Sequence, residues 1–319
     1  MSAAGNAVPK VSFGVPVYNG SGLLPRALDS LLAQTFADFE IVVSDNASTD
    51  GSGDIAEAYA RRDPRIRVVR QPVNLGAARN FNAVFRQTRG RYFKWMAHDD
   101  VLAQDYLEVC SGMLDRDPGA VLACTATALV NDDGSMLPFD AGLGAYVDRY
   151  GKPWYWPTEP EPNDDGDPVR RFSSLVLRNA WCLEVFGLIR SDALRRSSLI
   201  GAYYGSDKIL LAELATIGSF TRTPRQLFLR GCQPGQSSYL TPQQQATWIR
   251  GRRQRVSFDQ GLMLMNLLRA AWRRDLSIPQ RLACTFVVAR QATRGDKLRR
   301  LLVPGPGNYF GIGSRAARP

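Results

Sequence analysis

The sequence has 319 residues, of which 45% are hydrophobic and 22% charged, and its formal net charge is +10. These proportions are ordinary for a globular chain with a sizeable core, and no run approaches the roughly 18 consecutive apolar residues of a membrane-spanning helix. The five cysteines form no CxxC pair and the first ten residues hold no apolar signal core, which disfavours a zinc site, a disulfide framework and secretion. We therefore expect a cytoplasmic protein with reduced thiols.

Strand and helix patterns alternate along residues 11–130. The expected strands cover residues 11–18, 40–44, 65–69, 92–96 and 120–130, and the expected helices cover residues 23–32, 55–62, 76–88 and 102–114. This rhythm predicts an α/β fold with a Rossmann-like, mostly parallel sheet flanked by helices. Such sheets bind ligands beyond the carboxyl ends of their strands, so the polar pairs that close three of them should share one crevice: Tyr18 and Asn19, Asp45 and Asn46, Asp99 and Asp100.

The fourth expected strand runs directly into two carboxylates, Asp99 and Asp100, which follow the only histidine of the chain, His98. Adjacent carboxylates repel each other, and each is stabilised by a nearby cation. At the end of a central strand such a pair suits Mg²⁺ or Mn²⁺, which one or two carboxylates hold together with substrate phosphate oxygens. The alternative interpretation is a solvated N-cap for the helix expected from Leu102.

The regular alternation weakens after residue 130. Residues 137–168 are rich in Pro, Gly, Trp and acidic residues and predict a long loop or lid. Within it, Pro153-Trp154-Tyr155-Trp156-Pro157 either pins the loop to the surface or offers rings that stack on a sugar. Further helices are expected over residues 169–178 and 206–217, further extended segments over 185–190 and 219–230, a mostly helical region from 243, and a poorly ordered tail from 304.

The loop after the first strand excludes two common nucleotide-binding motifs. Dinucleotide-dependent oxidoreductases carry GxGxxG there, whereas this chain has Tyr18-Asn19-Gly20-Ser21-Gly22 without the third glycine. Walker A spacing is also absent. Hydride transfer is therefore disfavoured.

Five pieces within residues 11–130 resemble, in the right order, the nucleotide-sugar half of family 2 glycosyltransferases of the GT-A fold. The pieces are Val15-Pro16-Val17-Tyr18-Asn19, Gln34-Thr35-Phe36, Glu40-Ile41-Val42-Val43-Ser44-Asp45-Asn46-Ala47-Ser48-Thr49-Asp50, Asn74-Leu75-Gly76-Ala77-Ala78-Arg79-Asn80 and Met96-Ala97-His98-Asp99-Asp100. Gly205-Ser206-Asp207-Lys208 resembles part of the acceptor half of that family. The resemblance implies a GT-A domain over residues 1–240, with a nucleotide-sugar half (11–130) and an acceptor half (131–240), followed by a basic helical region (241–319).

At the nucleotide-base end, the resemblance implies roles for four residues. Pro16, Val17 and Tyr18 would line the base pocket through backbone groups and the aromatic ring. Asp45 would accept a hydrogen bond from uracil N3–H, unless it only forms an Asx turn before the next helix.

At the ribose and phosphate end, six more residues are expected to contribute. Asn74 and Gly76 would hold the phosphate-side loop, with Arg79 near the diphosphate or, alternatively, solvated on its helix. His98 would contact the ribose or else pack as a polar ring. The metal motif of the family is Asp-x-Asp, and its first position here is Ala97, so Asp99 is the expected ligand for Mg²⁺ or Mn²⁺, supported by Asp100.

The same resemblance implies an inverting single displacement at a sugar C1, with a nucleoside diphosphate as the leaving group. Asp207, at the start of an expected helix, takes the position of the family's catalytic Asp and is the expected general base, with Glu184 in reserve. The alternative for Asp207 is an acidic residue favoured by the helix dipole.

The implied donor is a UDP-sugar or similar nucleotide sugar, and the implied acceptor is a hydroxyl of a glycan, a lipid-linked compound or a small molecule. Two other functions stay open at this point. A nucleotidyltransferase shares the sheet and the metal logic but usually has a Gly-rich, basic phosphate loop after the first strand. A catalytically silent sugar-nucleotide-binding protein would explain the missing first Asp of the metal motif.

The positive charge is concentrated in the C-terminal quarter. Residues 241–319 hold 15 Lys and Arg against 3 Asp and Glu, whereas residues 1–240 hold 25 against 27. Three interpretations compete: a helical cap that packs its Leu and Met residues on the catalytic domain, loose electrostatic contact with the inner face of an anionic membrane, or nucleic-acid binding. The last is disfavoured because no known binding module accompanies the charge.

Overall fold

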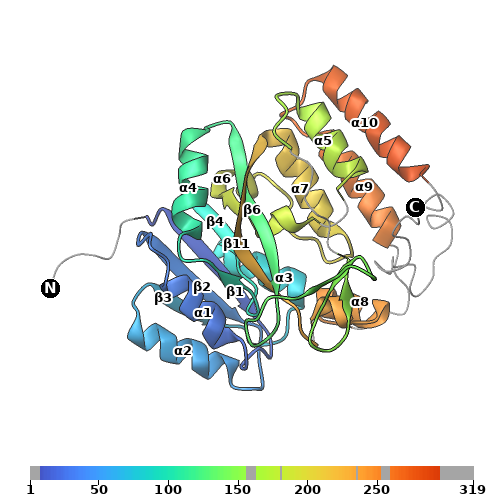
Figure 1. Cartoon of the computed structure of the whole chain (residues 1–319). Helices are drawn as coiled ribbons and strands as arrows, with labels where there is room; N and C mark the ends of the chain where they lie inside the picture. Colours follow the sequence, from blue (N-terminus) through green and yellow to red (C-terminus); the bar gives the residue numbers. More distant parts are fainter. Residues whose placement is uncertain (1–7, 156–162, 180–181, 235, 253–258, 295–319) are drawn as a thin grey trace.

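The computed structural model describes residues 8–155, 163–179, 182–234, 236–252 and 259–294, and it is built around one eight-stranded sheet (Figure 1). The strand order is β3-β2-β1-β4-β10-β6-β11-β5. The strands are β1 (Val11–Val17), β2 (Phe39–Asp45), β3 (Ile66–Arg70), β4 (Tyr92–Trp95), β5 (Val101–Leu102), β6 (Ala120–Val130), β10 (Leu188–Arg190) and β11 (Ser219–Gly231). Neighbours are parallel except where β10 lies between β4 and β6 and where β5 pairs with β11. The expected mostly parallel sheet is confirmed.

The central strand β1 is buried along its whole length, as its continuous apolar run predicts. Gly14 is required within it, because a Cβ there would lie 2.7 Å from the ring of Phe93 on the adjacent strand β4. Along β4, Phe93 and Trp95 point to one face of the sheet and Tyr92 to the other. The sheet therefore needs an apolar layer on both faces.

Helices provide both layers. One face is covered by α1 (Leu24–Leu32), α2 (Ser52–Arg62) and α4 (Tyr106–Arg116). The other is covered by α3 (Ala77–Arg86), α5 (Pro168–Leu177), α6 (Ser191–Arg195), α7 (Ser206–Ile217), α9 (Asp259–Ala271) and α10 (Ile278–Ala292). In Figure 1, α10 lies outermost, with α5 and α9 beside it. The last two helices thus pack as a helical cap would, with Leu267 and Cys284 in the shared core.

The helix expected over residues 102–114 begins later, because residues 101 and 102 form β5 instead. Leu102 pairs with Phe228 of β11 at the edge of the sheet, and α4 starts at Tyr106. Edge pairing and burial outweigh the local helical pattern here. The N-cap interpretation of Asp99 and Asp100 is therefore wrong, since Asp105 holds that position.

Residues 137–155, expected as a loop, contain a small antiparallel sheet of β7 (Phe139–Asp140), β8 (Ala145–Val147) and β9 (Pro153–Trp154). Trp154 is 6% exposed, and its Nε1 donates to Asp148 at 2.9 Å. Asp148 also accepts from the Tyr239 hydroxyl, which fixes this sheet to the turn after β11. Trp154 is therefore packed and not free to stack on a sugar, whereas Trp156, Pro157 and the tail from residue 304 lie outside the described residues.

All five cysteines are buried and unpaired, as expected of reduced thiols. Within the described ranges, no helix has the length and apolarity that crossing a bilayer would require.

Candidate functional site

The loops that follow β1 and β2 are joined by side-chain hydrogen bonds. Asn19 adopts a positive φ of 51°, and its Oδ1 accepts from the Thr49 N–H at 2.9 Å. Ser52 Oγ accepts from the Gly20 N–H at 2.9 Å, and Asp50 Oδ2 accepts from the Ser21 N–H at 2.9 Å. These bonds fix the backbone beyond both strand ends, so the floor of the crevice is rigid.

Asp50 stabilises this junction as a carboxylate. Burial alone would raise its pKa, but hydrogen bonds from Ser52 and Ser21 outweigh burial and lower the pKa to about 2. The charged form is therefore the one that holds the two loops together.

A third loop, between β3 and α3, is attached to the same junction by amide side chains. Asn46 Oδ1 accepts from the Leu75 N–H at 2.8 Å, and Asn46 Nδ2 donates to Asn74 Oδ1 at 3.0 Å. Asn74 Oδ1 also accepts from the Gly76 N–H at 2.8 Å. Gly76 has φ 80°, a conformation that glycine adopts without strain.

Helix α8 (Pro242–Arg250) lies against the start of α3. A Cβ on Gly76 would lie 2.3 Å from the backbone nitrogen of Gly251, and a Cβ on Gly251 would lie 2.5 Å from that of Gly76. Only glycine at both positions permits this backbone contact. The contact brings the C-terminal part of the chain over the crevice.

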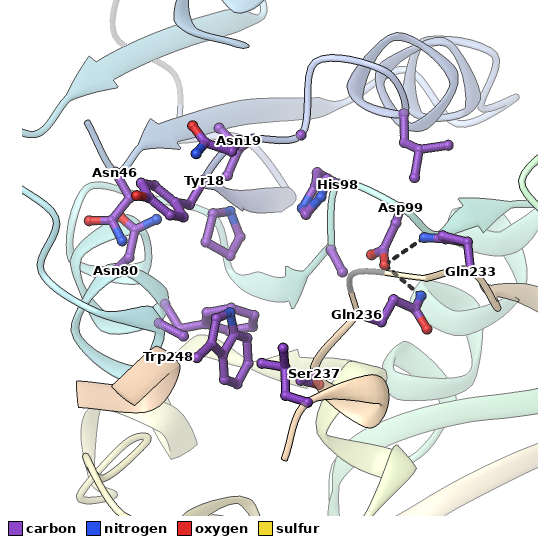
Figure 2. Close-up of a pocket in the computed structure, with 18 of the residues that line it drawn as sticks. Tyr18, Asn19, Asn46, Asn80, His98, Asp99, Gln233, Gln236, Ser237 and Trp248 are labelled. Atoms are coloured by element: carbon purple, nitrogen blue, oxygen red, sulfur yellow. Dashed lines mark hydrogen bonds between the residues drawn. The ribbon is translucent and has the colours of Figure 1, made fainter. Parts of the chain in front are cut away.

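Together these segments enclose a cavity of about 1120 Å³ at the carboxyl ends of the parallel strands. Figure 2 shows Tyr18, Asn19, Asn46 and Asn80 on one side, Trp248 and Ser237 on another, and Asp99 with two glutamines at one end. Tyr18 keeps 41% of its surface exposed, so its ring is available to a ligand. The lining is mixed, with aromatic rings, several amides, and titratable side chains that include Asp50, Asp99, Asp100 and Arg230, as in sites for polar ligands with a flat ring.

Six of the expected site residues line this cavity: Pro16, Val17, Tyr18, Asn74, His98 and Asp99. Gly76 lies at its edge, in contact with the lining residue Gly251. His98 packs so closely on Gly20 that a Cβ there would be 2.2 Å from the imidazole Cδ2. The expectation that strand ends bring these groups together is confirmed.

Two expected residues do not line the cavity. Asp45 is 3% exposed, and its Oδ1 accepts from the Ser48 N–H at 3.1 Å, which is the Asx turn given above as its alternative. Its neighbour Asn46 faces the cavity instead, since successive residues point to opposite sides. Arg79 is exposed on α3, because Ala77, Asn80 and Phe81 form the helix face toward the cavity and Arg79 lies opposite them.

Asp99 is held by two amides that no sequence motif pointed to. Its Oδ2 accepts from Gln233 Nε2 at 3.0 Å and from Gln236 Nε2 at 2.6 Å (Figure 2). Both glutamines follow β11, whose carboxyl end lies at the same edge of the sheet as that of β4. The strand-end rule could have found Gln233, whereas nothing in the sequence places Trp248 of α8 in the cavity.

Behind Asp99, Asp100 and Lys94 form a buried pair of titratable groups. Asp100 is 4% exposed and accepts from the Gly231 N–H at 3.1 Å, and burial together with the charge of Asp99 raises its pKa. Burial lowers the pKa of Lys94, whose Nζ lies over the rings of Tyr106 and Phe228 and donates to the Phe186 carbonyl. The charge of each group favours the charged form of the other. Lys94 lies in the core and does not line the cavity, whereas Asp99 does.

The residues around Asp99 fit a hard divalent cation, although the described residues contain no group of three His, Cys, Asp or Glu side chains that could hold one. The side-chain oxygens of Gln233 and Gln236 are buried and have no hydrogen-bond partner in the structure. One carboxylate and neutral oxygens, completed by phosphate oxygens, form a donor set that Mg²⁺ accepts.

The expected general base lies outside the lining of this cavity. Asp207, the second residue of α7, is half-buried, and its Oδ1 accepts from the Lys208 N–H at 2.9 Å. Burial raises its pKa, against the backbone hydrogen bond and the charge of Lys208. The reserve candidate Glu184 is 6% exposed and accepts from Asn179 Nδ2 at 2.9 and 3.0 Å, so it is engaged in a buried polar cluster.

Residues 12–152 match the family model described as Glycosyl transferase family 2. The hyaluronan synthase of Pasteurella multocida is 33% identical over 132 residues, which cover 41% of this chain and 14% of that protein. Glycosyltransferase GlyG of Streptococcus pneumoniae is 34% identical over 139 residues, which cover 44% of this chain and 46% of that protein. The match therefore spans less than half the length of either relative.

Two solved structures share the fold over most of the chain. The Staphylococcus aureus TarS structure in complex with UDP-GlcNAc aligns with a TM-score of 0.59 at 17% identity, over 91% of this chain and 76% of that chain. The mannosyltransferase PcManGT of Pyrobaculum calidifontis in complex with GDP-Man and Mn²⁺ aligns with a TM-score of 0.56 at 15% identity, over 93% and 73%. The fold of this chain is GT-A.

The junction at Asp50 generates a pH prediction. Asp50→Ala should lower the melting temperature at neutral pH by about 2–4 °C, the shift that ~1 kcal/mol gives in a domain of this size. The folded pKa of about 2 lies below the ordinary 3.8, so the stabilisation is complete above pH 3.8 and is lost as the pH falls toward 2. Thermal unfolding from pH 6 to pH 3 should show that the difference in melting temperature between wild type and Asp50→Ala becomes smaller as the pH falls.

Asp54→Ala is the control, since it removes a carboxylate that is 80% exposed, in the first turn of α2, which follows Asp50. It should change the melting temperature little at any of these pH values. If the difference in melting temperature between wild type and Asp50→Ala stays constant down to pH 3, the Asp50 carboxylate does not stabilise the loop junction as assigned.

Proposed function

We propose that the protein transfers a sugar from a nucleotide-diphosphate sugar to an acceptor hydroxyl, because residues 12–152 match the family model described as Glycosyl transferase family 2. The donor we propose is a UDP-sugar. The observation that carries the proposal is the cavity at the strand ends, with the Tyr18 ring at one end and Asp99 at the other. The matched structures with UDP-GlcNAc and GDP-Man support a nucleotide sugar as the ligand class.

The donor would lie with its base toward Tyr18 and its diphosphate toward Asp99. Base stacking on the half-exposed Tyr18 ring suits the base. Asn46 and Asn80 are each 2% exposed and hydrogen-bonded within the protein, so they shape the wall beside the base and ribose. Arg230 is a cation in the lining that suits the phosphates. Arg79 has no part in this proposal, because it faces away from the cavity.

A divalent cation would be held at Asp99 and would supply charge neutralisation for the leaving diphosphate. Protein side chains position the groups that surround the cation. Asp99 is positioned by Gln233 and Gln236, and His98 is held against Gly20, so the groups at this end of the cavity are fixed before the donor arrives.

We propose Asp207 as the general base that takes the proton of the acceptor hydroxyl, in a single displacement that inverts the anomeric centre. Its support is a pKa raised by burial, which brings a carboxylate closer to the operating pH, and its place at the start of α7. We also propose residues 1–240 as the GT-A domain, divided at residue 130 into donor and acceptor halves, and residues 241–319 as a basic helical region.

Nucleotidyl transfer is the second candidate. The Ser21–Gly22 turn after β1 joins Asp50 and forms no basic phosphate loop, which favours glycosyl transfer. Release of UDP from a UDP-sugar would support the first function, and release of pyrophosphate from a nucleoside triphosphate would support the second. A protein that binds UDP but releases neither product would be a silent binding protein.

We further propose that the outer surface of α9 and α10 contacts an anionic membrane. Six large apolar side chains form this α9–α10 apolar face, with exposed fractions between 37% and 72%: Met265, Leu268, Trp272, Ile278, Leu282 and Phe286. Helical spacing aligns the last three on one side of α10, and Trp272 Nε1 donates to Thr285 Oγ1 at 3.0 Å, which joins the two helices into one surface.

The charge around this face favours an anionic bilayer over a second copy of the chain as its partner. Arg269, Arg274 and Arg290 are exposed beside it, and residues 295–319 add five Lys and Arg against one Asp. A second copy docked symmetrically would bring these arginines against one another, which is unfavourable. An anionic bilayer matches both the apolar side chains and the arginines.

Asp99→Asn tests the donor site. The variant should fold normally but bind UDP much more weakly in Mn²⁺, because the carboxylate that completes the cation site is lost. Isothermal titration with UDP, with and without Mn²⁺, measures this. If the Mn²⁺-dependent gain in affinity is unchanged in the variant, Asp99 is not the cation ligand.

Asp207→Asn tests the base. Turnover should fall by about 10²–10⁴-fold with UDP binding little changed, because only the proton acceptor is removed. UDP release from the preferred UDP-sugar, measured with acceptor present, gives the rate. Near-normal turnover would reject Asp207, and Glu184→Gln would then be the variant to examine.

Vesicle co-sedimentation tests the α9–α10 apolar face. The wild type should bind anionic vesicles weakly at low salt, less at high salt, and neutral vesicles not at all. Phe286→Ser should weaken binding about 10–100-fold, since burial of a Phe side chain contributes about 1.5–3 kcal/mol.

Phe139→Ser is the matched control, because Phe139 is 59% exposed on β7, outside this face. It should leave vesicle binding unchanged. Equal effects of the two substitutions, or no wild-type binding to anionic vesicles at low salt, would leave α9 and α10 as a cap only.

A further inference from the structure

Asp99 is the carboxylate that the Asp-x-Asp motif gives the cavity, because its first position is Ala97, which has no side-chain oxygen, and its last position is Asp99. A divalent cation needs further oxygen donors at this point. We infer that Gln233 supplies one, so that its side-chain oxygen takes the place of the missing carboxylate; this rests on the proposed function.

Gln233 is held beside Asp99 by the end of β11. Gly231 permits the approach, since a Cβ there would lie 2.3 Å from the Asp99 carbonyl oxygen. The Gln233 side chain is 6% exposed, and its Nε2 lies 3.0 Å from Asp99 Oδ2. Its Oε1 is buried without a hydrogen-bond partner, and a Cβ on Gly231 would lie 2.9 Å from it.

A half-turn of the Gln233 amide exchanges Oε1 and Nε2 without moving the rest of the side chain. The oxygen would then occupy the position 3.0 Å from Asp99 Oδ2. Neighbouring oxygens around Mg²⁺ are about 3 Å apart, since the metal–oxygen distance is about 2.1 Å and the geometry is octahedral. With the cation bound, the Gln233 oxygen gains the cation as its partner, and the Nε2–Asp99 hydrogen bond is given up in exchange.

Gln236 differs in a way that makes it a positioning residue and not a ligand. Its Nε2 donates to the Gly231 carbonyl at 2.7 Å as well as to Asp99 at 2.6 Å. The same half-turn would break both bonds, so its amide stays as a donor. Gln236 orients Asp99, and Gln233 completes the oxygen set.

The test measures Mn²⁺ affinity in the presence of UDP by isothermal titration and by the Mn²⁺ electron paramagnetic resonance signal, which need no turnover. Gln233→Met, similar in size but without an oxygen, should weaken Mn²⁺ binding by more than the roughly 10–100-fold that loss of a residue positioning a ligand costs. Gln233→Glu, which adds a charge to the donor set, should strengthen it. In the Gln233→Met background, Ala97→Asp should recover affinity, because it restores a carboxylate at the first motif position.

Gln236→Met is the comparison variant, and all variants are first checked by thermal unfolding. Gln236→Met should weaken Mn²⁺ binding less than Gln233→Met does, because the Gln236 side chain orients Asp99 and is not itself a ligand of the cation. Unchanged Mn²⁺ affinity in both Gln233 variants, with binding still dependent on Asp99, would overturn the inference and leave the proposed function intact. If the wild type binds neither UDP nor Mn²⁺ with UDP, both fail.

Discussion

The contact between Gly231 and the Asp99–Asp100 turn joins the two halves of the cavity. The Gly231 N–H donates to Asp100, its carbonyl accepts from Gln236, and its missing side chain leaves room for the Asp99 carbonyl. β11 and β4 are not neighbours in the sheet, and the contact follows from the antiparallel pairing of β11 with β5, in which Leu229 lies opposite Val101, directly after the Asp99–Asp100 turn. Without it, Asp99 would lose both amide partners and the buried Asp100 would lose a backbone donor.

The buried charges behind the cavity follow from the same arrangement. Burial raises the pKa of Asp100 and lowers that of Lys94, and each charge partly compensates the other. Lys94 is fully buried yet surrounded by the rings of Tyr106 and Phe228, which stabilise an ammonium group in place of water. These buried charges compensate each other within the core, and of the two adjacent acids at this end of the cavity Asp99 is the more accessible.

The first half of the chain could be predicted from its sequence because its signals are local. Continuous apolar runs such as β1 identify buried strands, and the polar residues that follow them converge by topology, as Tyr18, Asn74 and Asp99 do. Single side chains are harder to predict, because a shift of one position along a helix or strand turns a side chain away from the cavity. Arg79 lies on the far side of α3, and Asp45 turns into its own loop while Asn46 faces the cavity.

The parts that could not be predicted depend on contacts between distant segments. β5 exists because β11 offers it an edge, and residues 137–155 form strands because Asp148, Trp154 and Tyr239 meet. Trp248 enters the cavity only because α8 packs on α3. None of these pairings leaves a pattern within its own segment, and tertiary contacts outweigh local propensity in each of them.

The glycine pair at positions 76 and 251 has a consequence for folding. The two residues lie far apart in the sequence, so their contact closes a very long loop, and we expect it to form late in folding. The N-terminal strands can form a sheet earlier, but one wall of the cavity is absent until α8 docks. A ligand that binds the completed cavity therefore stabilises the docked C-terminal segment along with the sheet, and ligand binding reports on the folding of the whole chain.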